Sequence, residues 1–159
     1  MTRKRKKHTS VHQQLDNHFE EVKREFAADG IDINRDHSSH REGKISDRIS
    51  FLVGPLLEDT DTSNFKSNIV AIACAAWNVS LLKMSERQPT IDKFIGVLVP
   101  IANNVEARAM FQKTFDDFIQ RKLSHFPNDK RYITSYKVIP TNSGFQLSIA
   151  SVDTENRPR

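Results

Sequence analysis

The first apolar pattern along the chain is a narrow stripe near the N-terminus. Apolar residues recur there at steps of four, four, three and four, and they are Val11, Leu15, Phe19, Val22 and Phe26. This spacing is typical of one face of an α-helix, and charged residues between positions 20 and 25 occupy the other faces. We therefore predict an amphipathic helix over residues 11–29, joined to the rest of the chain by a polar linker over residues 30–44.

Helical periodicity continues through the middle of the chain, and it predicts four further helices. They are expected over residues 45–57, with a bend near Gly54-Pro55; from about 63 to 82; from Pro89 to a limit at Pro100; and over 105–126, stopped by Pro127. The helix near 63–82 is apolar around almost its whole circumference and rich in alanine. We expect it in the centre of a helix bundle.

The hydrophobic period changes from 3.6 to 2 near the C-terminus. Residues 132–139 and 145–149 alternate as strands do, and the turn sequence Pro140-Thr141-Asn142-Ser143-Gly144 lies between them. A lone hairpin is marginal in water, so one face must lie on the helices. The predicted fold is mainly α with a C-terminal β-hairpin (α+β): about five helices packed as a bundle, with a two-stranded antiparallel hairpin docked on it. Residues 45–152 form this domain, and residues 153–159 form a tail.

Charge is concentrated at the start of the chain. The 159 residues fit one domain plus tails and carry a net charge of +4. Residues 1–10 have no apolar residues to bury beyond Met1, so we expect a disordered basic arm. Clustered cations attract phosphate by releasing counterions, and we predict nonspecific nucleic-acid contact through Arg3, Lys4, Arg5, Lys6 and Lys7. A solubilising tail is the alternative interpretation.

The segment from Phe126 to Arg131 joins the last helix to the first strand within a few residues. Pro127 favours an extended Phe126, and Asn128-Asp129 favours a turn. The charged residues Asp129, Lys130 and Arg131 have two interpretations. They form local ion pairs that hold the hairpin on the helices, which we favour, or they present an exposed site to a phosphate or acidic partner.

The candidate chemistry is weaker than the structural alternatives. Trp77 and the single cysteine, Cys74, lie on the most apolar helix and are interpreted as core residues, with Asn78 bonding to a loop or neighbouring helix. The histidine pairs His8/His12 and His37/His40 lie in segments expected to be mobile, and the carboxylate pairs Asp59/Asp61 and Asp116/Asp117 are expected to face solvent. The chain has no P-loop, nucleophile elbow or dinucleotide fingerprint. We predict no catalytic residue, no metal and no cofactor, and regard an enzyme as the least favoured class.

The same patterns bear on where the protein works. No apolar run approaches the roughly 20 residues of a bilayer span. The cationic start is followed by polar residues 8–14 where a signal peptide would be apolar. These features predict a cytoplasmic protein without a membrane partner.

Two segments resemble uncharacterised bacterial helical-domain proteins. They are Ala75-Ala76-Trp77-Asn78-Val79-Ser80-Leu81-Leu82, and Phe126-Pro127-Asn128-Asp129-Lys130-Arg131-Tyr132-Ile133 with the hairpin ending Leu147-Ser148-Ile149-Ala150-Ser151. Some of those proteins carry a cysteine-rich SEC-C metal motif, which is absent here, so no metal role transfers. The resemblance spans residues 45–151 and implies a fold without an activity.

These observations favour a non-enzymatic binding module attached to nucleic acid through its arm. The alternative is a protein–protein interaction or oligomerisation module. In that case the stripe Val11, Leu15, Phe19, Val22 and Phe26 would bury itself on a partner or a second copy, since it lies beyond a polar linker.

Overall fold

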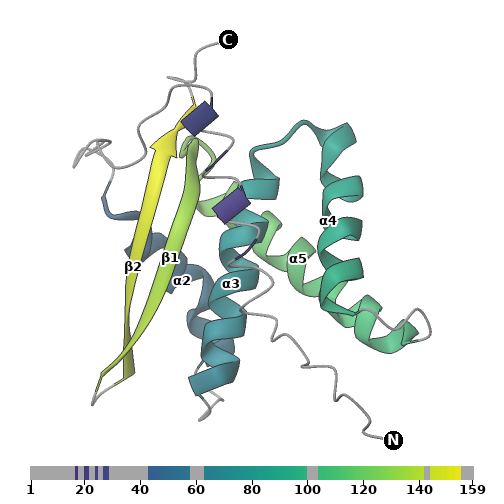
Figure 1. Ribbon diagram of the computed structural model, residues 1–159, viewed down its shortest axis with the longest axis horizontal. Coiled ribbons are helices and arrows are strands. Elements are labelled where there is room, and N and C mark those ends of the chain that lie inside the picture. Colours follow the sequence, from purple (N-terminus) through teal and green to yellow (C-terminus); the bar gives the residue numbers. More distant parts are fainter. Residues whose placement is uncertain are drawn as a thin grey trace, which may run out of the picture.

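The computed structural model describes residues 43–57, 63–99, 104–141 and 144–154, together with Asn17, Glu20, Glu21, Arg24, Ala27 and Ala28. The elements are α2 (Ile45–Leu57), α3 (Ser63–Ser80), α4 (Met84–Leu98), α5 (Val105–His125), β1 (Arg131–Thr141) and β2 (Gly144–Asp153) (Figure 1). The prediction of a mainly helical α+β chain with a C-terminal antiparallel hairpin is confirmed.

The number of helices differs from the prediction. The described part of the chain contains four helices, where about five were expected. The remaining expected helix, over residues 11–29, falls outside the described residues except for the six positions between 17 and 28. Those six positions are helical and exposed.

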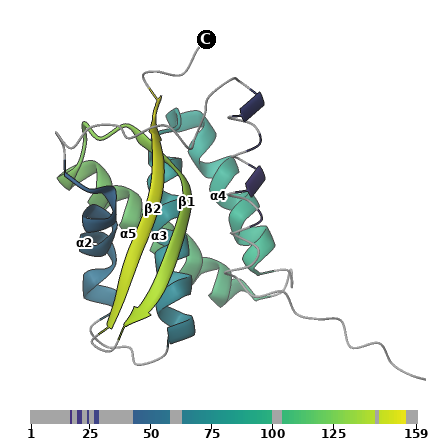
Figure 2. The ribbon, with the colours of Figure 1, turned by 60° about the vertical axis from the view of Figure 1, so that its left-hand side comes forward.

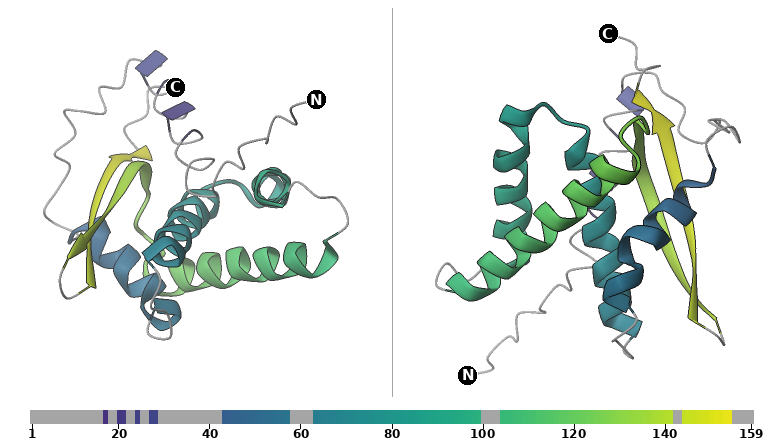
Figure 3. Two further views of the ribbon diagram at one scale, coloured as in Figure 1. Left: turned by 60° about the horizontal axis from the view of Figure 1, so that its bottom comes forward. Right: turned by 180° about the vertical axis from the view of Figure 1, so that it is seen from behind.

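Helix α3 is the central element of the fold. Every residue from Ile69 to Ser80 is buried, and α3 contacts α2, α4, α5 and β1. Figure 2 shows the hairpin lying on one side of α3, beside α2, and Figure 3 shows α5 passing along another side towards α4. The small residues between Ala71 and Ala76 let these neighbours approach closely.

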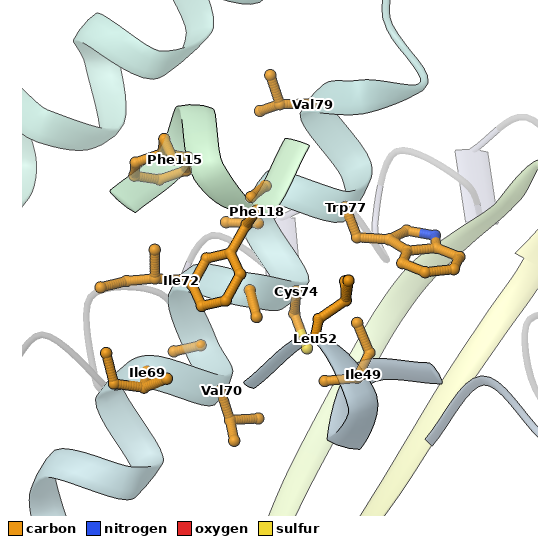
Figure 4. Close-up of a cluster of buried hydrophobic side chains, with 14 of the residues drawn as sticks. Ile49, Leu52, Ile69, Val70, Ile72, Cys74, Trp77, Val79, Phe115 and Phe118 are labelled. Carbon is orange, nitrogen blue, oxygen red and sulfur yellow. The ribbon is translucent and has the colours of Figure 1, made fainter. Parts of the chain in front are cut away.

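The core residues Cys74 and Trp77 lie one turn apart on α3 and contact different neighbours. Cys74 lies beside Leu52 and Ile49 of α2, and the indole of Trp77 points towards the hairpin (Figure 4). Both side chains are fully buried. Burial raises the pKa of the Cys74 thiol, so the reactive thiolate is disfavoured. The interpretation of both residues as core is confirmed.

Helix α4 begins earlier than the sequence predicted, at Met84 instead of Pro89. Proline is favoured in the first turn of a helix, but here Pro89 lies inside α4. The start is fixed by Glu86, whose Oε2 accepts a hydrogen bond of 3.3 Å from the Lys83 amide. Thr90 Oγ1 also donates to the Glu86 carbonyl at 2.8 Å, so this side chain adds a hydrogen bond in the turn that Pro89 weakens.

The proline inside α2 has a different effect. Because Pro55 has no amide proton, it cannot bond to the carbonyl of Phe51 four residues earlier. That carbonyl accepts a hydrogen bond of 3.1 Å from Arg121 Nη2 on α5. A side chain of α5 thus supplies the hydrogen-bond donor that Pro55 lacks, and this bond joins α2 to α5.

The hairpin is longer than predicted, and its register shifts once. Ile133 pairs with Ser151, and Ser135 pairs with Ala150, so Thr134 is an extra residue in β1. Ile133 and Thr134 are therefore both buried, and beyond the bulge the inward face passes to Tyr136 and Val138. The strict alternation expected over residues 132–139 is interrupted at Thr134.

Two side chains of α3 hold the first residues of β1. Trp77 Nε1 donates to the Arg131 carbonyl at 2.8 Å. The Asn78 amide bonds to both backbone groups of Ile133, donating to its carbonyl and accepting from its amide, each at 2.8 Å. Asn78 thus pairs with a strand, where a loop or helix was expected, and it takes the place of a neighbouring strand along this part of β1.

Replacing Trp77 tests this packing. Trp77→Ala should lower the free energy of unfolding by about 3–5 kcal/mol, because it leaves a cavity beside the hairpin. Trp77→Phe keeps an aromatic ring but leaves the buried Arg131 carbonyl without its donor, and should cost about 1–3 kcal/mol. Urea unfolding followed by circular dichroism gives both values. Labelling of Cys74 in the native wild-type protein serves as the control, and rapid labelling would contradict the tight core.

Candidate binding site between helices α2 and α5

A buried carboxylate organises the corner, the segment from Phe126 to Arg131. The Asp129 side chain is fully buried and accepts hydrogen bonds from Arg131 at its backbone amide (3.1 Å), Nε (2.9 Å) and Nη2 (2.6 Å). Arg48 of α2 donates a further bond through Nη1. Arg131 also donates through Nη1 to the Gly43 carbonyl at 3.1 Å. Asp129 therefore joins the strand, the corner and the start of α2.

The charges around Asp129 decide its ionisation. Burial acts to raise the pKa of this carboxyl. The hydrogen bonds from Arg131 and the positive charges of Arg131 and Arg48 outweigh burial, so the pKa of Asp129 lies below its ordinary value. The carboxylate is ionised at neutral pH and balances only part of the positive charge that surrounds it.

Lys122 of α5 is a second buried charge near the corner. Its side chain is 1% exposed, and its Nζ lies 5.2 Å from the centre of the Trp77 ring. No hydrogen bond or ion pair joins this Nζ to another residue that the structure describes. Burial lowers the pKa of Lys122, the negative charge of Asp129 opposes this shift, and the charges of Arg87 and Arg48 add to it.

A hollow of about 360 Å³ lies beside the corner, between the start of α2 and the end of α5. It is lined by Gly43, Lys44, Asp47, Arg48, Phe51, His125 and Phe126. Lys44, Asp47 and His125 are exposed, whereas Arg48 is held by its bond to Asp129. The hollow thus combines aromatic rings, basic side chains and one exposed carboxylate.

The rings of the hollow pack edge to face. The ring of Phe51 lies 4.8 Å from that of His125 and 5.7 Å from that of Phe126, both in T-shaped arrangements. Arginines cover two of the rings: Arg48 Cζ lies 5.1 Å from the Phe126 centroid, and Arg121 Cζ lies 5.6 Å from that of Phe51. Phe51 is nevertheless 46% exposed.

A second hollow, of about 230 Å³, continues along the same pair of helices. It is lined by Pro55, Leu56, Asp117, Phe118, Gln120 and Arg121. Arg121 lines this second hollow and also lies over the Phe51 ring of the first. Leu56 is 43% exposed here.

The charged residues predicted in the corner fall into two groups. Asp129 and Arg131 are buried and form the predicted local ion pair. Lys130 is exposed, and its carbonyl accepts bonds from the amide and hydroxyl of Thr154 at the end of the hairpin. The pairing thus joins the hairpin to the helices, while a partner-binding role for the three residues stays a prediction.

The other predicted sites have mixed outcomes. The arm residues 3–7 and the stripe of the first helix, Val11, Leu15, Phe19, Val22 and Phe26, lie outside the described residues. So do Asp59, Asp61 and the four histidines of the candidate pairs. Asp116 and Asp117 are exposed and bond to Gln112 and Lys113 one turn away. Over the described ranges, no cluster of three or more potential metal ligands occurs.

The residues of the hollow were not identified from the sequence. Phe51 falls outside the apolar stripe of residues 45–57, and an aromatic residue at a polar position of an amphipathic helix is the signal that could have indicated it. Arg48 and His125 carry no comparable signal, because their meeting depends on how α2 and α5 pack.

Comparisons with known proteins add no relative. No model of a protein family, no curated protein and no solved structure matches this chain. Within residues 43–154, as far as the structure describes them, no helix is long and apolar enough to cross a bilayer.

The Asp129 cluster predicts a specific pH dependence. Because the pKa of Asp129 is lowered by folding, its ionisation stabilises the protein above about pH 4, the ordinary value for this group, and this stabilisation is lost as pH falls through the lowered pKa. Asp129→Ala should cost about 3–5 kcal/mol at pH 7, since it leaves buried arginine unpaired. The difference from wild type should shrink below about pH 4 in urea unfolding. Lys122→Met is the matched control, because removing an unpaired buried charge should cost much less.

Proposed function

We propose that this protein is a cytoplasmic, non-enzymatic binding module, a helical bundle with a docked hairpin, that attaches to nucleic acid. The basic arm, residues 3–7, supplies long-range attraction to phosphates, and the folded domain supplies a second contact at the hollow between α2 and α5. Phosphate contacts need positive charge but no catalytic group, so this function suits a domain whose cysteine is buried and whose described carboxylate pair is bonded on a helix surface.

The observation that carries the proposal is the charge around the aromatic hollow. Three cationic side chains, Lys44, Arg48 and Arg131, line the hollow or lie in the corner, against two carboxylates, Asp47 and Asp129. Lys44 and Arg48 line the hollow together with Phe51, and Arg121 lies over the Phe51 ring. Positive charge next to exposed aromatic rings is a common property of surfaces that bind nucleic acid.

A protein partner is the second candidate. The exposed Leu56 and the second hollow beside Pro55 favour it, because exposed apolar residues along a seam between helices suit a docked segment. The amphipathic stripe within residues 11–26 belongs to the same hypothesis. A pull-down from lysate with and without nuclease treatment separates the two candidates. Nuclease should remove from the captured material only a nucleic-acid partner and the proteins bound to that nucleic acid, whereas a direct protein partner should stay.

Neutralising the arm tests the first candidate. In the full chain, replacing Arg3, Lys4, Arg5, Lys6 and Lys7 with glutamine should weaken nucleic-acid binding and flatten its dependence on salt. The slope of log affinity against log salt should fall by about 0.7–0.9 for each phosphate that the arm no longer neutralises. Fluorescence anisotropy titrations from low to physiological salt measure both quantities. Lys93→Gln, which removes one exposed charge on α4, is the control, and an unchanged slope in the arm variant would contradict the proposal for the arm.

A further inference from the structure

We propose that the hollow between α2 and α5 takes an unpaired base of single-stranded nucleic acid against Phe51, while Lys44 and Arg48 contact the neighbouring phosphate. This inference rests on the proposed function and deepens it, because it assigns the class of nucleic acid and the residues that select it.

The exposed ring of Phe51 is the stacking surface. Phe51 is 46% exposed, and on the part of its ring that Arg121 does not cover, any base can stack through its flat face. The neighbouring ring of His125 is exposed as well, and it lies 4.8 Å from Phe51. The hydrogen bond from Arg121 to the Phe51 carbonyl fixes the backbone from which this ring projects.

The hollow has the size and opening for one base on a continuing strand. Its volume of about 360 Å³ is at the low end of the range for small-molecule sites, roughly 300–1,000 Å³. It is open to solvent, so the strand on either side of the bound base is not confined. A base in a duplex is stacked between neighbours and cannot enter without being flipped out.

The charged residues of the hollow match an unpaired nucleotide. Lys44 is exposed at the start of α2, and Arg48, one turn later, is held in place by Asp129. Both cations attract a phosphate, whereas Asp47 in the same lining repels it. Asp47 is suited to accept a hydrogen bond from N–H groups on the Watson–Crick edge of a base, which are free in a single strand and occupied in a duplex.

The experiment measures binding of the full chain to DNA by fluorescence anisotropy. It compares a fluorescein-labelled single strand of mixed sequence with the duplex of the same sequence. The strand is about 12 nucleotides long, which spans one typical binding site. We expect the single strand to bind at least about tenfold more tightly than the duplex. Phe51→Leu should weaken single-strand binding about tenfold, which is about 1.4 kcal/mol, and leave duplex binding unchanged. Phe51→Trp should keep the affinity, because it keeps a stacking surface. Lys44→Gln should lower the single-strand salt slope by about 0.7.

Matched controls separate the hollow from general effects. Met110→Leu changes another exposed apolar residue, on the far part of α5, and Lys137→Gln removes an exposed charge on β1. Both variants should bind as wild type does. The melting temperatures of Phe51→Leu and Lys44→Gln should equal that of wild type. If Phe51→Leu melts at a lower temperature, the binding results of Lys44→Gln and Phe51→Trp decide whether the hollow is the site.

The outcomes distinguish this inference from the proposed function. If wild type binds DNA but Phe51→Leu and Lys44→Gln bind it equally well, the hollow is not the site, and of the proposed function only attachment through the basic arm stands. Equal losses for single strand and duplex would also overturn base recognition. If no oligonucleotide binds at low salt, the proposed function itself fails. Binding of a protein partner that is abolished in Phe51→Leu, without DNA binding, would assign the hollow to protein docking and overturn the inference.

Discussion

The fold depends on the contact by which helix α3 replaces a missing strand. A two-stranded hairpin leaves backbone groups unpaired along its outer edges, and buried groups of this kind are costly. Trp77 and Asn78 bond to three backbone groups of β1, at Arg131 and Ile133, just before the bulge at Thr134. These bonds fix the position and direction of β1 relative to α3. The corner, the buried carboxylate and the hollow are placed by this one attachment.

The polar corner follows from where β1 is held. Because Arg131 is anchored through its carbonyl to Trp77, its guanidinium is directed to Asp129 and the Gly43 carbonyl. Asp129 in turn fixes Arg48, and Arg48 covers the ring of Phe126. A chain of bonds thus runs from the central helix to the rim of the hollow. Arg48 at the rim is thereby held in one position by a buried carboxylate.

The sequence predicted those features that depend on local periodicity and failed where distant residues meet. The apolar circumference of residues 69–80 indicated a central helix, and the change of period indicated the hairpin. Both patterns depend only on residues that are close together in the sequence. The early start of α4 was not predicted, because proline is typical of the first turn of a helix and Pro89 lies further inside this one. The bulge at Thr134 was missed because alternation of apolar and polar residues does not show where one strand has an extra residue.

The hollow could not be predicted at all: Arg48, Phe51 and His125 lie on two helices, and their proximity depends on packing. The arm and the first amphipathic stripe, the strongest functional signals in the sequence, stay predictions.

Trp77 is also the only tryptophan in the chain, and this gives the molecule an internal optical reporter. Its indole is fully buried and bonded to the first residue of β1, while most of the peptide dichroism comes from the helices. Its emission therefore reports the environment at the junction of helix and hairpin, and dichroism reports the helices. If the hairpin separates from the helices before they unfold, the emission shifts to longer wavelength first. The two signals coincide only if docking of the hairpin and formation of the helical core are one cooperative event.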